Sequence, residues 1–248
     1  MLVLLPPSEG KTGPVRGRSL DLGLLSFEPL TEPRAQVLAA LAAVSAQPDA
    51  VAQLGVPPTL DAEVARNTRL LTAPTAEAGR VYSGVLYSAL DLPSLDPDAR
   101  RRARRWLVIV SALFGAVRLG DHIPAYRLSM AVNLPPLGPL AGVWRAPLSA
   151  VLPAAAGRGV VVDCRSSTYA AAWVPQGPLA ERWVRVRVPG ASHLAKQTRG
   201  LVARHLCVVG EQPRTPADLA RVVGTAFAVA LTPPPRPGQG WVLDVWEP

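Results

Sequence analysis

The sequence is poor in cysteine and lysine and has no long hydrophobic run, and each shortage excludes a class of protein. Its two cysteines, Cys164 and Cys207, form neither a disulfide framework nor a CxxC pair, so we expect no disulfide scaffold and no structural zinc. No uninterrupted apolar stretch approaches the ~20 residues that span a bilayer. The first apolar run stops at Pro6 and lacks a basic flank, unlike a signal peptide. We therefore expect a cytoplasmic protein with no membrane partner.

Positive charge is in excess. Lysine and arginine together number 26 against 18 acidic residues, which gives a formal net charge of +8. A basic surface raises the local concentration of polyanions and so favours nucleic acid or phosphorylated ligands as partners. The alternative explanation is a proteome that is basic and arginine-rich throughout.

The two lysines are singled out by their rarity. Only Lys11 and Lys196 are lysines among the 26 basic residues. The composition is typical of a GC-rich genome, in which a solvated surface cation is usually arginine. A lysine that persists in such a chain suggests a need for a compact ammonium, which the planar guanidinium cannot imitate. Chance survival of both remains the alternative.

The apolar patterns predict strands that alternate with helices. Strands are expected at residues 2–5, 106–113, 159–165, 183–188 and 240–246, and helices at 33–46, 59–71, 75–89, 95–105, 143–156, 191–209 and 215–231. Ser192 is the expected N-cap of the helix at 191–209. This order predicts an α/β (mixed α+β) fold. We expect one compact domain over residues 1–248, with a mixed sheet enclosed by helices.

Polar residues follow four of the predicted strands. They lie at residues 8–11, 111–127, 163–169 and 190–199. Ligands of such sheets bind in the crevice outside the carboxyl ends of the strands, so we expect these segments to meet there. The Gly10-Lys11 turn resembles a phosphate loop only in outline, because the P-loop spacing is absent.

Several motifs carry a resemblance to a known family. They are LPPSEGK at residues 5–11, SALFGAVRLGDHIPAYRLSM at 111–130, DCRSSTY at 163–169 and KQTRGL at 196–201. In these segments, and in this order, the chain resembles the YaaA family of peroxide stress proteins from residue 1 to about residue 230. The block at 111–130 is the most specific of the four.

The resemblance implies a compact mixed α/β fold with a positively charged cleft and a role during hydrogen peroxide stress. It also implies binding of duplex or branched DNA, in part through a helix-hairpin-helix element at residues 195–231. The connecting turn departs from the usual hairpin, since it holds one glycine where two are expected. Arg214 and the helix start at Thr215 could still meet a phosphate.

The candidate site residues divide by chemistry. Ligand or phosphate binding is assigned to Lys11, Arg118, Tyr126, Arg127, Ser166, Lys196 and Arg199. Candidates for a catalytic role are Ser8, Glu9 and Asp163, and Ser8 near Lys11 has the outline of a serine activated by lysine. Alternatively, Arg118 and Arg127 form core ion pairs with Asp121 or Glu9. Cys164 follows three valines, so a buried and inert thiol is expected.

Two functions remain open from the sequence. The first is a DNA-binding protein that holds phosphates through a basic cleft without reading the base sequence. The alternative is an enzyme that cleaves an N-glycosidic or phosphoester bond in a nucleotide, nucleoside or other phosphorylated substrate, in the same cleft. No cofactor or metal is expected. A closed pocket around Lys11 and Lys196 would favour a small substrate, whereas an open groove would favour a duplex.

Overall fold

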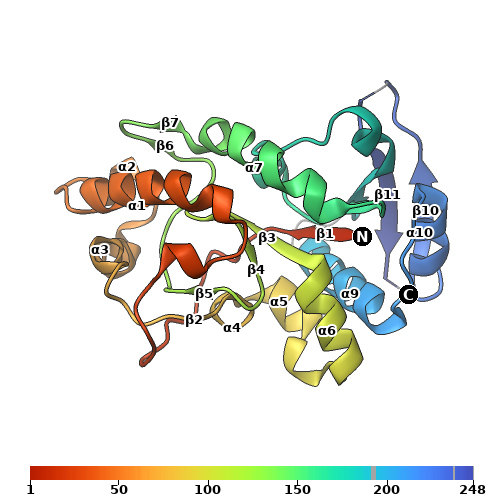
Figure 1. Cartoon of the computed structure of the whole chain (residues 1–248), viewed down its shortest axis with the longest axis horizontal. Coiled ribbons are helices and arrows are strands. Elements are labelled where there is room, and N and C mark those ends of the chain that lie inside the picture. Colours follow the sequence, from red (N-terminus) through yellow and green to blue (C-terminus); the bar gives the residue numbers. More distant parts are fainter. Residues whose placement is uncertain (191–193, 237, 248) are drawn as a thin grey trace.

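The fold is built on a seven-stranded mixed sheet (Figure 1). The computed structural model describes residues 1–190, 194–236 and 238–247. Across the sheet the strands run in the order β10 (Ala228–Thr232), β11 (Trp241–Trp246), β9 (Trp183–Arg187), β8 (Val161–Asp163), β1 (Leu2–Leu5), β3 (Leu107–Ser111) and β4 (Gly115–Arg118). The strands from β11 to β3 are parallel, and β10 and β4 add antiparallel edges. The α/β fold with a mixed sheet is therefore confirmed.

The burial of each strand follows from its sequence. Every residue of β1 and β3 is buried, as expected for apolar runs in the middle of a parallel sheet. In β9 the valines are buried whereas Arg185 and Arg187 are exposed, which is the predicted basic face. The parallel arrangement brings the carboxyl ends of β1, β8 and β9 to one edge of the sheet.

Helices cover both faces of the sheet. The longer ones are α1 (Thr31–Ser45), α6 (Pro97–Trp106), α7 (Leu140–Ala156), α9 (Leu194–Val209) and α10 (Pro216–Val223). Shorter ones are α2 (Ala50–Gln53), α3 (Asp61–Arg66), α4 (Ala78–Val81), α5 (Val85–Leu90) and α8 (Ser167–Ala170). In Figure 1, α1 and α7 lie on one side of β1 and β3, and α5, α6 and α9 lie on the other. No described helix is long and apolar enough to cross a membrane.

Local signals explain where two of these helices begin. The Asp96 side chain accepts hydrogen bonds from the main-chain N–H groups of Asp98 and Ala99, both at 2.8 Å, and so caps α6. Thr215 and Asp218 form a reciprocal capping box at the start of α10. Ser192, the expected N-cap of α9, lies outside the described residues.

Two predicted helices are wrong in part. The helix predicted at 75–89 is interrupted: β2 (Ala76–Glu77) pairs with β5 (His122–Ile123), and a turn at residues 82–84 separates α4 from α5. Gly84 has φ +95° in that turn, a conformation that excludes a continuous helix. The helix predicted at 215–231 ends at Val223, because residues 228–232 alternate in burial and pair with β11 as β10. The helix-hairpin-helix element is therefore not confirmed.

Most of the buried apolar side chains form one contiguous core. It includes all four sulfur-containing residues, namely Met1, Met130, Cys164 and Cys207, none more than 9% exposed. A short hairpin of β6 (Asn133–Leu134) and β7 (Gly138–Pro139) precedes α7. Against the core, Gly115 at the start of β4 has φ +69°, and an added Cβ there would overlap the ring of Trp144 in α7. The Leu-Phe-Gly motif is thus explained by packing as well as by the turn.

Candidate active site

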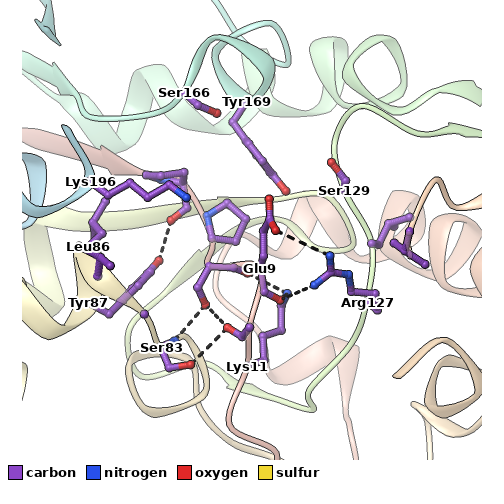
Figure 2. A pocket seen from close by; sticks show the side chains of 18 of the residues that line it. Glu9, Lys11, Ser83, Leu86, Tyr87, Arg127, Ser129, Ser166, Tyr169 and Lys196 are labelled. Atoms are coloured by element: carbon purple, nitrogen blue, oxygen red, sulfur yellow. Dashed lines mark hydrogen bonds and ion pairs between the residues drawn. The ribbon is translucent and has the colours of Figure 1, made fainter. Parts of the chain in front are cut away.

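The main cavity lies at the carboxyl ends of β1 and β8 and has a volume of about 540 Å³. Side chains from the loop after β1, from the 82–84 turn and the start of α5, from the segment after β5 and from α8 and α9 surround it (Figure 2). We call it the Lys11 pocket. Its lining consists of Pro6, Pro7, Ser8, Glu9, Gly10, Lys11, Gly55, Val56, Pro57, Ser83, Gly84, Val85, Leu86, Tyr87, Arg127, Leu128, Ser129, Ser166, Tyr169, Lys196 and Arg199.

The loop after β1 is fixed by the 82–84 turn. The main chain of Lys11 forms an isolated antiparallel bridge with Tyr82, and the Thr12 N–H donates to the Val81 carbonyl at 2.9 Å. The Ser83 N–H donates to Ser8 Oγ at 2.9 Å. Ser8 is therefore held as a hydrogen-bonding support for the turn. Its hydroxyl donates to the Gly10 carbonyl, whereas Lys11 Nζ donates to the main-chain carbonyl of Ser8.

Lys11 is held by carbonyl oxygens and aromatic rings. Its Nζ donates to the carbonyls of Ser8 at 2.9 Å and Glu9 at 3.2 Å. The same atom lies 4.2 Å from the centroid of the Tyr126 ring. Burial, followed by the charge of Arg127, lowers the pKa of Lys11 to about 7, although Glu63 and Glu9 act in the opposite direction. A large fraction of this side chain is therefore a neutral amine near neutral pH.

A cluster of phenols lies beneath this amine. The hydroxyl of Tyr126 exchanges hydrogen bonds with Tyr82 at 3.0 Å and Ser111 at 2.7 Å. The Tyr87 hydroxyl donates to the Pro6 carbonyl at 2.8 Å. Desolvation raises the pKa of Tyr82, Tyr87 and Tyr126, so these groups stay protonated. They supply hydrogen bonds and ring faces but no negative charge to Lys11.

Arg127 is positioned through its main chain. The buried side chain of Asn67 donates to the Arg127 carbonyl at 2.8 Å and accepts from its N–H at 2.9 Å. The guanidinium donates from Nη1 to the Glu9 carbonyl at 3.3 Å, and it lies 3.7 Å from the Glu9 carboxylate and 3.9 Å from the Glu63 carboxylate, too far for a direct hydrogen bond to either carboxylate. Figure 2 shows Arg127 directed toward Glu9, with Tyr169 reaching toward the same region. The guanidinium thus faces the cavity with weak acidic partners.

Lys196 and Arg199 come from the start of α9. Gly200 lets this helix approach α5 closely, because an added Cβ would overlap the Leu86 carbonyl oxygen. Lys196 lies in the first turn of α9, where the helix dipole disfavours a cation unless an anion is nearby. Arg199 donates from Nε to the Val186 carbonyl at 3.3 Å. Among the described residues, no carboxylate oxygen lies within 4.0 Å of the Lys196 or Arg199 head groups.

The structure brings most of the predicted site residues together. Those that line the Lys11 pocket are Ser8, Glu9, Lys11, Arg127, Ser166, Lys196 and Arg199. Tyr126 lies beneath Lys11. Arg118 is elsewhere, since its Nη1 donates to the Arg105 carbonyl at 2.6 Å and its guanidinium stacks 5.2 Å from the Phe27 ring.

Asp163 also lies apart from the Lys11 pocket. Its carboxylate accepts from Arg165 Nε at 2.8 Å and Nη2 at 2.7 Å, and from Trp183 Nε1 at 3.0 Å. Both members of this ion pair are buried. Every oxygen of Asp163 is therefore engaged within the fold, which suits a structural role better than proton transfer. We call Asp163, Arg165 and Trp183 the Asp163 cluster.

Other lining residues were not predicted from the sequence. Tyr87 and Ser129 enter the pocket, and Asn67 orients Arg127 from outside it. In the sequence, Gly84 could have indicated the turn between α4 and α5 that places Ser83 in the pocket. No feature of the sequence pointed to Asn67.

The expected burial of Cys164 is confirmed, and burial raises the pKa of its thiol to about 12. Within the described part of the chain, no three His, Cys, Asp or Glu side chains are grouped to hold a metal ion.

Comparison with known proteins gives a consistent result over nearly the whole chain. The model of a family described as peroxide stress protein YaaA matches residues 1–230. A UPF0246 protein of Streptomyces coelicolor is 48% identical over 99% of this chain and 98% of its own length. UPF0246 proteins of Corynebacterium efficiens and Corynebacterium glutamicum are 40% and 36% identical, each over 92% of this chain and 95% and 94% of their own lengths.

Proposed function

The chain belongs to the family of the peroxide stress protein YaaA, and from this premise we propose that it binds a phosphorylated ligand of nucleotide size in the Lys11 pocket during peroxide stress. The proposal combines the role of the family with the geometry of one cavity. It favours the small-ligand alternative of the sequence analysis over binding of a duplex in an open groove.

One observation carries the proposal: cations outnumber carboxylates in the pocket lining. Lys11, Arg127, Lys196 and Arg199 line it, whereas Glu9 is its one lining carboxylate among the described residues. Arg127 and Arg199 are partly buried, and Lys196 is exposed beside them. Like charges gathered in one cavity repel one another, so the arrangement is costly unless an anion completes it. A phosphate supplies the charge and the acceptor oxygens.

The size and the neutral groups of the pocket support a nucleotide-like ligand. A volume of about 540 Å³ lies in the range of about 300–1,000 Å³ that is typical of small-molecule sites. Ser83, Ser129 and Ser166 add hydroxyls that can bond to phosphate or sugar oxygens. Tyr87 and Tyr169 add aromatic surface, on which a base or sugar can pack.

A second cavity favours nucleic acid as the source of that nucleotide. It has a volume of about 330 Å³, and its lining includes Arg185 and Arg199. Arg165 and Arg187 also line it, but they are paired with Asp163 and Asp244. Arg199 also lines the Lys11 pocket, so the two cavities share one arginine. A strand could place backbone phosphates against Arg185 and one unstacked nucleotide in the Lys11 pocket. This second candidate predicts that log K for DNA falls with log salt, with a slope of about −0.9 per phosphate contact for duplex and about −0.7 for single strands.

Calorimetry with matched variants tests the proposal. The probes are a nucleoside monophosphate and a short oligonucleotide, titrated at fixed salt into wild type, Lys196→Met and Arg158→Met. Arg158 is exposed and lies outside the pocket, and both variants lose one positive charge. We expect Lys196→Met to weaken binding about 10- to 100-fold, the loss typical of a charged hydrogen-bond partner, and Arg158→Met to change it less than about twofold. Equal weakening by both variants would mean that only net charge matters and would overturn the pocket proposal.

A further inference from the structure

We propose that Lys11 is a nucleophile that forms an imine with an aldehyde-bearing sugar phosphate held in the Lys11 pocket. The inference rests on the proposed function, because the same cations would hold the phosphate. It adds a covalent step and a substrate class. The aldehyde can belong to a free open-chain sugar phosphate or to a deoxyribose in DNA that has lost its base, since both present the same group.

The contacts of Lys11 differ from those of a lysine that serves only as a cation. No carboxylate oxygen among the described residues lies within 4.0 Å of Nζ, which contacts two carbonyls and the face of Tyr126. A neutral amine has two N–H groups and one lone pair. The carbonyls of Ser8 and Glu9 accept both N–H groups, which leaves the lone pair uncommitted on a side chain that lines the cavity.

The surroundings favour the neutral form of the amine. The charged groups near it are Arg127, Glu63 and Glu9, and the phenols of Tyr82 and Tyr126 remain protonated. Glu9 is 84% exposed at its side chain, so its opposing charge is largely screened by water. Only the neutral amine attacks a carbonyl, and a lysine desolvated in an apolar pocket or beside another cation is the usual activated form.

The cations that can bind a phosphate and the proposed nucleophile come from different elements of the fold. Lys196 and Arg199 come from α9 and can hold a phosphate, while Lys11 comes from the loop after β1. Figure 2 shows Lys196 and Lys11 on different sides of the Glu9 side chain. A ligand with a phosphate at one end and an aldehyde at the other would therefore span the pocket.

The covalent step balances without an oxidant or a reductant. The Lys11 lone pair adds to the aldehyde carbon, and the carbonyl oxygen takes up a proton to give a carbinolamine. Loss of the hydroxyl with a second proton releases one water and forms the carbon–nitrogen double bond. Overall, amine plus aldehyde gives imine plus water. The exposed Glu9 carboxylate is placed to exchange these protons with solvent.

Reductive trapping tests the inference in the full chain. Wild-type protein is incubated with glyceraldehyde 3-phosphate, or with an oligonucleotide that contains one base-less deoxyribose, and sodium cyanoborohydride is added to reduce any imine. Intact mass spectrometry then detects the adduct, and peptide mapping locates it. The chain has only two lysines, so the assignment is direct. We expect an adduct on Lys11 with at least one probe, formed faster at pH 8 than at pH 6 because the neutral amine increases.

Variants and a binding assay separate the possible outcomes. Lys11→Arg keeps a long basic side chain but removes the nucleophilic amine, and we expect it to reduce adduct formation at least 100-fold. Adduct with only one probe still supports the imine and identifies the source of the aldehyde. Adduct found only on Lys196 or the N-terminus, or no adduct from a wild type that still binds a nucleoside monophosphate, would overturn the imine and leave the proposed function intact. Absence of both adduct and nucleotide binding would overturn both proposals.

Discussion

The Lys11 pocket and the Asp163 cluster follow neighbouring strands of one sheet, yet they treat charge in opposite ways. In the Asp163 cluster the Arg165 guanidinium and the Asp163 carboxylate satisfy each other in the core. In the Lys11 pocket, cations exceed carboxylates and are held by main-chain bonds and helix packing instead. The comparison indicates that polar residues at strand ends become candidates for chemistry only where the fold leaves their charges unpaired.

The largest expected loss of stability comes from a substitution in the Asp163 cluster. Asp163→Asn leaves the guanidinium of Arg165 buried without its counter-charge, and removal of one partner of a buried pair costs about 3–5 kcal/mol. Urea denaturation measures the loss. Glu211→Gln is the matched control, because its pair with Arg221 is exposed to solvent and should contribute little to stability.

The contrary result would reverse the roles given to the two regions. If Asp163→Asn were as stable as wild type but had lost activity on a bound ligand, Asp163 would belong to the chemistry and the cluster would not be structural.

A somewhat smaller loss of stability is expected from a substitution at the contact between α9 and α5, which positions Lys196 and Arg199. Gly200→Ala introduces a methyl group against the Leu86 carbonyl oxygen, which forces α9 away from α5. Overpacking of this kind costs about 1–3 kcal/mol and would move Lys196 and Arg199 outward, so nucleotide affinity should also fall. Differential scanning calorimetry and ligand titration measure both changes.

Gly142→Ala is the control for that substitution. Gly142 lies in α7 with no heavy atom within 4 Å of an added Cβ, so alanine there should raise stability by about 0.5–1 kcal/mol. If both alanine variants were stabilised, the close approach of α9 to α5 would not be what places the two cations.

The smallest effect concerns Lys11 and has the opposite sign. The pKa of Lys11 is about 7 in the folded chain and near 10.5 when exposed. Between these values the unfolded state binds more protons, so stability rises with pH across this window, and below pH 7 the full cost of the buried ammonium is present. Lys11→Met should therefore stabilise the protein, by on the order of 1–2 kcal/mol at pH 7 and by less as pH approaches 10.

Urea denaturation at several pH values checks the sign. Arg158→Met serves as the control, because Arg158 is exposed and lies outside the Lys11 pocket, so its effect should not vary with pH. A Lys11→Met effect that is equally flat would show that Lys11 is not desolvated in the pocket.

The core of the fold and much of the site could be predicted from the sequence. The runs LVLL and WLVIVSAL predicted buried strands correctly, because central parallel strands need apolar residues on both faces. The rule that ligands meet the carboxyl ends of such strands then placed Lys11, Ser166 and Lys196 together.

The errors arose where long-range contacts decide local structure. The AVALT segment is compatible with a helix and becomes β10 only because β11 offers a strand to pair with. Asn67 could not be predicted as the support of Arg127, since the two are 60 residues apart and meet only in the folded chain. The contacts of Asp163 could not be predicted for a similar reason, since its pairing with Arg165 and with the distant Trp183 is a property of the fold.

The burial of the sulfur atoms has a consequence for a family named for peroxide stress. Peroxide attacks exposed thiolates and thioethers first, and the susceptibility of a thiol rises with its thiolate fraction. Met1, Met130, Cys164 and Cys207 are in the core, and burial raises the pKa of both cysteines to about 12. The folded chain therefore offers an oxidant no easy target. It should retain its shape and its pocket while proteins with exposed sulfur are being inactivated.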